Sequence, residues 1–321
     1  MPIFDLPLEQ LRKYKGTNPR PKDMDEYWDS ALRELEGFDF NVKLERAQFE
    51  APGCDCFDLW FTGIGGARVY SKYLRPKDSV SKPHPAVIVF HGYRGSSPDW
   101  ADMLKYVFLG FSVAALDCRG QGGRSEDLGG VKGTTVMGHI VRGLDDPDPK
   151  KLLYRSIFLD TVAIARIMMD MEDVDETRVG VTGGSQGGGL ALACSALEPR
   201  VKLSFVRFPF LSDYKRVWDL DLAKDAYEEL SAYFRRMDPR HEREREVFTR
   251  LGYIDVQHLA SRIKAEVLMV TGLMDTVCPP STQFAAYNKI KSKKKMIIYP
   301  DYGHENMPGV SDIEFEFLSK L

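Results

Sequence analysis

The sequence lacks long apolar runs and a secretory start. No stretch of its 321 residues approaches the roughly 20 apolar residues of a membrane-spanning helix, which excludes such a helix within these residues. The first residues, Met1 to Leu6, show no basic cluster followed by the apolar core of a signal peptide. We therefore expect a soluble, cytoplasmic protein.

Cysteine is scarce and neither sign of charge dominates. The cysteines are Cys54, Cys56, Cys118, Cys194 and Cys278. This odd, scattered set excludes a disulfide framework, and free thiols suit a reducing compartment. A formal net charge of -3 and a pI near 6.1 provide no attraction for nucleic acid or an anionic membrane, so we expect neither partner. The basic run 291–295 directly precedes an apolar strand pattern and is interpreted as a solvated loop.

The motifs of common cofactor and metal sites are also missing. His304-Glu305 is not followed by the second histidine of a zinc-binding H-E-x-x-H helix. Neither a Walker-type phosphate loop nor a G-x-G-x-x-G turn with a partner acid occurs. We therefore expect chemistry that uses no cofactor and no metal.

Short apolar runs alternating with helical segments are what the sequence does contain. Near-continuous apolar runs occupy residues 86–90, 111–116, 178–182, 203–208, 267–270 and 296–299. Such runs are typical of parallel strands covered on both faces. Helical spacing between them is clearest over 154–171, and a helical segment to about Gly37 and a hairpin (57–61 and 67–74) come first. The pattern predicts an α/β fold: a mostly parallel central sheet flanked by helices, with an N-terminal helical extension.

Two segments interrupt this alternation. Residues 120–151 are rich in Gly, Asp and Pro, and so long an excursion in a compact domain is usually functional or interfacial. Residues 213–250 are heavily charged with aromatic side chains interleaved. That composition favours a helical insert packed over one end of the sheet rather than a solvated helix pair. Because no internal repeat or low-complexity stretch occurs, we expect a single domain over 1–321.

One serine lies among glycines, between an apolar run and a small-residue helical pattern. Residues 183–187 read Gly-Gly-Ser-Gln-Gly and match the motif G-x-S-x-G. In that motif a sharp strand-to-helix turn exposes the serine hydroxyl, and the glycines let neighbouring backbone approach without Cβ clashes. Because a helix begins there, unpaired N–H groups lie close to where an oxyanion would form. Ser185 is therefore the candidate nucleophile of an α/β-hydrolase fold.

A serine nucleophile needs a base, usually a histidine that a carboxylate orients. In this fold the order along the chain is serine, acid, histidine. Asp275 follows the run 267–270 and His304 follows the run 296–299, so they are the candidate acid and base. Two alternatives stay open: Asp275 as a helix N-cap, and Asp301 as the acid, although Asp301 lies too near His304 for separate loops.

The loop after the run 86–90 reads His91-Gly92-Tyr93-Arg94-Gly95. In the α/β-hydrolase fold this loop supplies one backbone N–H of the oxyanion hole, and the residue after the nucleophile supplies the other. We assign these two donors to Tyr93 and Gln186. His91 is interpreted as shaping the loop, because the chain order favours His304 as the base.

Taken together, these motifs resemble carbohydrate esterase family seven, the acetyl xylan esterases and cephalosporin C deacetylases. The resemblance rests on Arg119-Gly120-Gln121-Gly122 after a strand, on the serine turn 183–187, and on His304-Glu305. Three flanking segments match as well: residues 4–8, 174–178 and 279–288. The likeness therefore covers nearly the whole chain.

The resemblance implies an esterase that releases acetate from acetylated xylose, xylo-oligosaccharides and cephalosporin C through an acetyl-serine intermediate. It implies the catalytic and oxyanion-hole residues assigned above. It also implies a cytoplasmic homohexamer, a trimer of dimers, with residues 120–151 at a subunit interface. Two departures concern substrate and interface detail: Tyr154 alone remains where a tyrosine cluster is expected, and Arg207 replaces a smaller or acidic residue.

Other functions fit the same residues less well. A short-chain carboxylesterase or dienelactone-type hydrolase of other specificity would use the same fold. Peptidases of this architecture usually carry an extra propeller domain, for which 321 residues leave no room. A catalytically inactive binding protein would keep the fold, but all three candidate catalytic residues are present.

Overall fold

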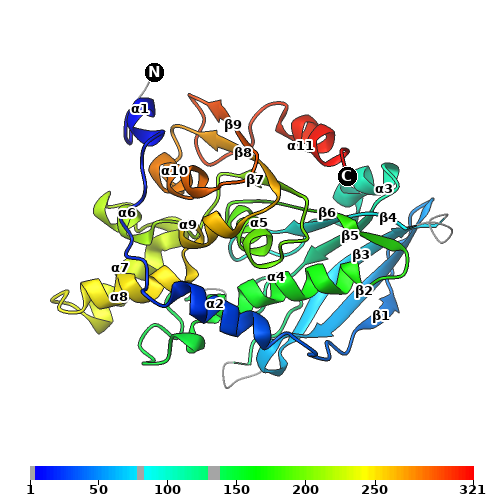
Figure 1. Ribbon diagram of the computed structural model, residues 1–321, viewed down its shortest axis with the longest axis horizontal. Coiled ribbons are helices and arrows are strands. Elements are labelled where there is room, and N and C mark those ends of the chain that lie inside the picture. Colours follow the sequence, from blue (N-terminus) through cyan, green and yellow to red (C-terminus); the bar gives the residue numbers. More distant parts are fainter. Residues whose placement is uncertain (1–3, 78–82, 129–137) are drawn as a thin grey trace.

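The computed structural model describes residues 4–77, 83–128 and 138–321, which are built around one central sheet (Figure 1). The strands are β1 (Lys43–Arg46), β2 (Cys54–Thr62), β3 (Arg68–Pro76), β4 (His84–Phe90), β5 (Ser112–Leu116), β6 (Val174–Gly184), β7 (Leu203–Arg207), β8 (Glu266–Gly272) and β9 (Lys294–Tyr299). Their order in the sheet is β1-β2-β3-β5-β4-β6-β7-β8-β9. Every pairing from β5 to β9 is parallel, whereas the pairings that involve β1, β2 and β3 are antiparallel. The mostly parallel sheet and the hairpin are confirmed.

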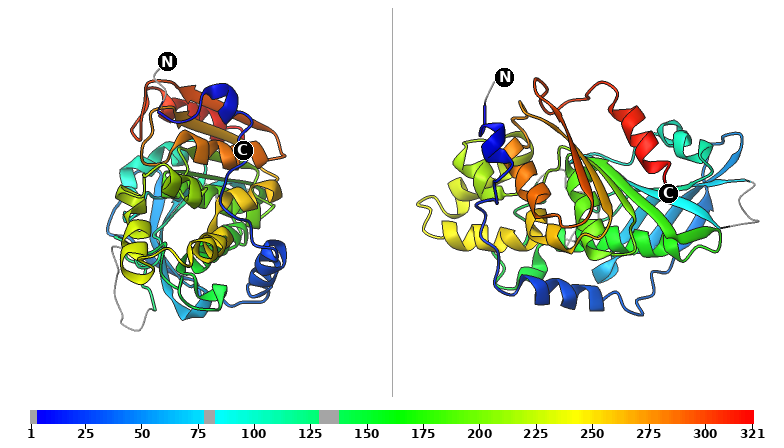
Figure 2. Two further views of the ribbon diagram at one scale, coloured as in Figure 1. Left: turned by 90° about the vertical axis from the view of Figure 1, so that its left-hand side faces the viewer. Right: turned by 45° about the horizontal axis from the view of Figure 1, so that its top comes forward.

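Helices cover both faces of this sheet. They are α1 (Leu8–Leu11), α2 (Met24–Arg33), α3 (Leu104–Phe108), α4 (Leu153–Met169), α5 (Gln186–Leu197), α6 (Tyr214–Asp219), α7 (Glu228–Met237), α8 (Glu244–Leu251), α9 (Val256–Leu259), α10 (Pro280–Lys289) and α11 (Val310–Leu318). Helices α2, α4 and α5 pack on one face, while α3 and α11 pack on the other (Figures 1 and 2). Among the described helices, none is long and apolar enough to cross a membrane.

The two covered faces explain the unbroken apolar runs. Along β4, Ala86, Ile88 and Phe90 pack into the core beneath α4 and α5, whereas Val87 packs into the core beneath α3 and α11. Successive side chains of a strand point to opposite faces, so a strand buried on both sides needs apolar residues at every position.

A buried ion pair joins helix α4 to the turn that follows β5. The Arg119 guanidinium donates to both carboxylate oxygens of Asp160, each at 2.6 Å, and a third bond of 3.0 Å reaches the Ile64 carbonyl. The exposed fractions of the Arg119 and Asp160 side chains are 5% and 1%. The bidentate geometry holds in place the start of the Arg119-Gly120-Gln121-Gly122 turn.

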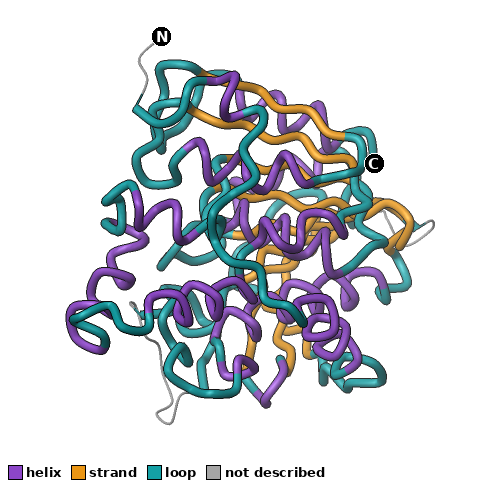
Figure 3. Tube along the Cα trace, turned by 60° about the vertical axis from the view of Figure 1, so that its left-hand side comes forward, coloured by secondary structure: helices purple, strands orange, loops and turns teal. Residues whose placement is uncertain are grey.

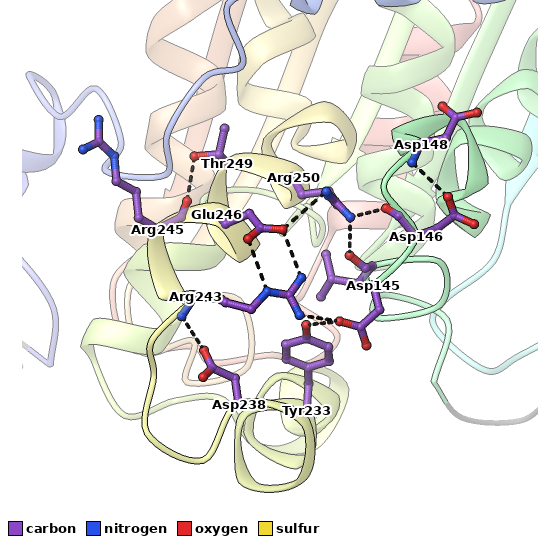
Figure 4. A network of polar contacts seen from close by, with 11 residues as sticks. Asp145, Asp146, Asp148, Tyr233, Asp238, Arg243, Arg245, Glu246, Thr249 and Arg250 are labelled. Carbon is purple, nitrogen blue, oxygen red and sulfur yellow. Dashed lines mark hydrogen bonds and ion pairs between the residues drawn. The ribbon is translucent and has the colours of Figure 1, made fainter.

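The predicted insert over 213–250 is helical, and it is attached to residues 144–146 by the network in Figure 4. Arg243, at the start of α8, pairs with Asp145 at 2.9 Å and with Glu246 at 3.0 Å. Arg250, in the last turn of α8, donates to the carbonyl oxygens of Leu144, at 2.9 Å, and of Asp146. The predicted excursion over 120–151 includes residues 129–137, which lie outside the described part of the chain.

The edge strand and the N-terminal segment show what the sequence pattern does not predict. All four residues of β1 are exposed, so Lys43–Arg46 carries no apolar alternation by which to recognise a strand. Residues 12–23 run from α1 across the helices to α2 (Figures 1 and 3), and along this path Asn18 N–H donates to the buried Asp213 at 2.7 Å. Residues 291–293 of the basic run form a loop at the surface, as expected, but Lys294 and Lys295 belong to β9, so the loop prediction is wrong for these two residues.

Candidate active site

Ser185 lies at the sharp turn between β6 and α5, as the motif predicts. Its backbone angles are φ 56° and ψ −120°, a conformation that non-glycine residues adopt rarely. A Cβ on Gly187 would lie 2.0 Å from the Phe90 carbonyl oxygen, and one on Gly183 would lie 2.4 Å from the Gly187 carbonyl group. Because backbone atoms approach this closely, Gly183 and Gly187 leave no room for a side chain.

The structure brings the three candidate catalytic residues together. His304 Nε2 lies 3.0 Å from Ser185 Oγ, and His304 Nδ1 lies 2.9 Å from Asp275 Oδ2. The Phe208 ring packs against the imidazole at a centroid distance of 4.6 Å. The Asp275 side chain is fully buried, whereas 20% of the His304 side chain is exposed. This arrangement has the geometry that a proton transfer from Ser185 to His304 would require.

Asp275 is fixed by more than its histidine partner. Its Oδ1 accepts the backbone N–H groups of Val277 and Cys278 at 2.9 and 2.7 Å, and its Oδ2 accepts the Gln283 amide at 3.2 Å. Helix α10 begins at Pro280 with Pro279 at the N-cap position, so Asp275 is not the cap of that helix. The competing acid, Asp301, is exposed and has no hydrogen bond to His304 in the described structure.

His91 holds the loop that follows β4. Its Nε2 accepts the Cys118 N–H at 2.9 Å, so the proton of the neutral ring belongs on Nδ1, which donates to the Gly92 carbonyl at 2.7 Å. Burial lowers the pKa of His91, which favours this neutral form. Both ring nitrogens are thus occupied, in agreement with a loop-shaping role.

A buried amide pair ties the same loop to the serine turn. The Gln121 amide nitrogen donates to Gln186 Oε1 at 2.7 Å, and Tyr154 OH donates to the same oxygen at 2.7 Å. Gln121 Oε1 in turn accepts the Arg94 N–H at 2.9 Å. Within the described residues, the backbone N–H groups of Tyr93 and Gln186 form no backbone hydrogen bond among the turns, loops and caps, which is compatible with the oxyanion-hole role predicted for them.

Only one set of side chains in the described ranges has the make-up of a metal site. The possible ligand atoms of Asp275, Cys278 and His304 lie within 4.8 Å of one another. Both His304 nitrogens already have hydrogen-bond partners, and burial raises the pKa of the Cys278 thiol well above its usual range. A protonated thiol is a poor ligand, so the geometry favours proton transfer over metal binding.

Sequence reasoning misses two contacts of this site. Phe208, at the end of β7, packs on His304, and Glu229, in α7, accepts a hydrogen bond from the Tyr93 hydroxyl. Phe208 is one more apolar residue after an apolar run, and Glu229 is one of several acidic residues in a charged helix. No local spacing distinguishes either position.

Comparison with known proteins identifies the family. The model of the acetyl xylan esterase (AXE1) family matches residues 1–321, the whole chain. The chain belongs to the acetyl xylan esterase family. This confirms the resemblance seen in the sequence motifs and places the chain among carboxylic ester hydrolases with the α/β-hydrolase fold.

Three similar proteins illustrate the range of similarity. Acetyl xylan esterase 1 from Thermoanaerobacterium sp. JW/SL YS485 is 59% identical, with 99% of each chain covered and a TM-score of 0.95. The acetyl xylan esterase from Paenibacillus sp. R4 is 34% identical, covering 98% of this chain and 99% of its own, with a TM-score of 0.91. Acetyl esterase Axe7A of Xylanibacter ruminicola is 26% identical over 301 residues, which make up 92% of this chain but 65% of that relative. The chain thus spans slightly less than two thirds of that relative's length.

Proposed function

We propose that this member of the acetyl xylan esterase family hydrolyses acetyl esters of xylose and short xylo-oligosaccharides, and the acetyl ester of cephalosporin C. The observation that carries the proposal is the hydrogen-bonded series of Ser185 Oγ, His304 Nε2, His304 Nδ1 and Asp275 Oδ2, with distances of 3.0 and 2.9 Å. The names of the relatives, acetyl xylan esterase and acetyl esterase, support an acetyl ester as the substrate.

In the proposed mechanism Ser185 Oγ attacks the acetyl carbonyl carbon while His304 Nε2 takes its proton. The N–H groups of Tyr93 and Gln186 bind the oxyanion, and Asp275 stabilises the imidazolium. His304 then protonates the alcohol oxygen of the substrate as its bond to the acetyl carbon breaks, which releases the free alcohol and leaves an acetyl-serine. A water molecule that gives its proton to His304 attacks this ester, and acetate leaves as Ser185 regains its proton.

Acetate release from three esters tests the substrate assignment. We expect the protein to release acetate from acetylated xylo-oligosaccharides, from cephalosporin C and from p-nitrophenyl acetate, as measured by an acetate assay under initial-rate conditions. Cleavage of p-nitrophenyl acetate alone would reduce the proposal to the runner-up function, a short-chain carboxylesterase or dienelactone-type hydrolase. No cleavage of any of the three would refute it, and would favour a binding protein.

We also propose a homohexamer that works in the reducing cytoplasm. The family resemblance is the ground for the assembly, since the exposed Phe108 (85%) and Met237 (62%) lie on different helices, α3 and α7, and form no continuous patch on the described surface. Five free, buried cysteines support the reducing compartment. Light scattering at micromolar protein is expected to give the mass of six chains of 36.4 kDa each, and a single-chain mass would contradict the assembly.

A further inference from the structure

Glu229 occupies a position where an apolar residue is expected. It belongs to the buried face of α7, which it shares with Leu230, Tyr233 and Phe234. Only 4% of Glu229 is exposed. A carboxylate in such a position is unfavourable unless its oxygens are hydrogen-bonded, so its partners indicate what it does there.

The partners of Glu229 belong to two other segments. Its Oε2 accepts the backbone N–H groups of Ile140 and Val141 at 2.7 and 3.1 Å. Its Oε1 accepts the hydroxyl of Tyr93. Burial raises the pKa of Glu229 to about 7, and the N–H donors of Val141 and Ile140 oppose that rise. One carboxylate therefore links α7, the segment after residue 137 and the loop after β4.

The Tyr93 side chain is confined on its other sides as well. Its ring lies edge-on to His139, at a centroid distance of 5.7 Å, and against Phe210 at 5.3 Å. The next residue, Arg94, pairs with Glu228 of α7 at 2.6 Å. With the ring enclosed and the hydroxyl bound, the direction of the Tyr93 backbone N–H is coupled to the position of Glu229.

We propose that Glu229 is a positioning residue for the oxyanion hole, holding the Tyr93 N–H in place through the Tyr93 hydroxyl. This rests on the proposed function, in which that N–H binds the oxyanion. Glu229 touches no reacting atom. The contribution of Glu229 matters when negative charge develops on the substrate oxygen. Displacing a preorganised N–H donor reduces the stabilisation of the transition state more than that of the ground state.

Two variants test the proposal with p-nitrophenyl acetate. Glu229→Leu removes both acceptor oxygens, so the Tyr93 hydroxyl loses its partner; a glutamine at this position could keep the contact, because its amide can donate to the hydroxyl oxygen. Tyr93→Phe removes the hydroxyl alone. We expect each to lower kcat about 10- to 100-fold, with KM within about 2-fold of wild type. The double variant should be no slower than the slower single variant, because both act through one contact.

Glu246→Leu provides the matched control. It makes the same chemical change in α8 of the same insert, at a side chain that is 49% exposed and pairs with Arg243 and Arg250 (Figure 4). Its kcat should stay within about 2-fold of wild type. Thermal unfolding curves must show every variant folded at the assay temperature, so that a loss of kcat is not a loss of folded protein.

The outcomes separate this proposal from the proposed function. Wild-type protein without activity toward p-nitrophenyl acetate would overturn both. Active wild type with unchanged kcat in Glu229→Leu would overturn the positioning role alone. The same holds if the losses in the double variant multiply, since Glu229 and Tyr93 would then act independently.

Discussion

Replacing Ser185 with alanine is expected to lower kcat for acetyl ester hydrolysis by about 10⁴- to 10⁶-fold. The variant loses the hydroxyl oxygen that lies 3.0 Å from His304 Nε2, so the proposed acetyl-enzyme cannot form. Binding and the backbone donors of Tyr93 and Gln186 would account for any residual rate. Initial rates of p-nitrophenol release at saturating p-nitrophenyl acetate measure the loss.

Ser195→Ala is the control for this experiment. Ser195 lies in α5, is fully buried, and donates to the Ala191 carbonyl at 2.7 Å. Alanine suits a helix at least as well as serine, so this variant should fold and keep wild-type kcat. If Ser185→Ala also kept a rate near that of wild type, Ser185 would not be the nucleophile and the proposed mechanism would be wrong.

Asp160→Asn is expected to destabilise the fold by about 3–5 kcal/mol, because it leaves the Arg119 guanidinium buried without a counter-charge. Both carboxylate oxygens of Asp160 accept from Arg119 at 2.6 Å, and an amide can accept at one position only. We expect the midpoint of thermal unfolding to fall by roughly 5–15 °C, as measured by circular dichroism or differential scanning fluorimetry.

An exposed ion pair and a double replacement show whether burial is the cause. Asp29→Asn breaks the ion pair between Arg262 and Asp29, whose side chain is 53% exposed. This replacement should change the free energy of unfolding by less than about 1 kcal/mol. Replacing Arg119 and Asp160 together with methionine and leucine should recover part of the loss, because no uncompensated charge then remains. Equal effects of Asp160→Asn and Asp29→Asn would contradict this explanation.

The sheet and the three candidate catalytic residues could be predicted because their signals are local. A strand buried on both faces is an unbroken apolar run, as in β4 and β8, and the serine turn is a short glycine pattern. Asp275 and His304 each follow such a run, so the position of the strands is enough to locate them. These features depend on neighbouring residues in the chain and not on the tertiary contacts.

The remaining contacts of the site depend on residues far apart in sequence. Tyr93 and Glu229 are 136 positions apart, and Gln121 and Gln186 are 65 apart. Nothing in the neighbourhood of Glu229 distinguishes it from an ordinary charged residue of a surface helix. Its burial follows from how α7 packs against segments that the sequence pattern alone does not bring together. Strand β1 could not be predicted for a different reason, since its residues are exposed and carry no apolar pattern.

The attachment of the helical insert bears on the physical state of the substrate. Enzymes that act on lipid droplets have a lid over the active site, and this lid opens at the lipid–water interface. Here such a movement would break the contacts of Arg243 and Arg250 with residues 144–146 and would also strip the buried Glu229 of its donors. An insert fastened in this way suits esters that arrive one molecule at a time from aqueous solution.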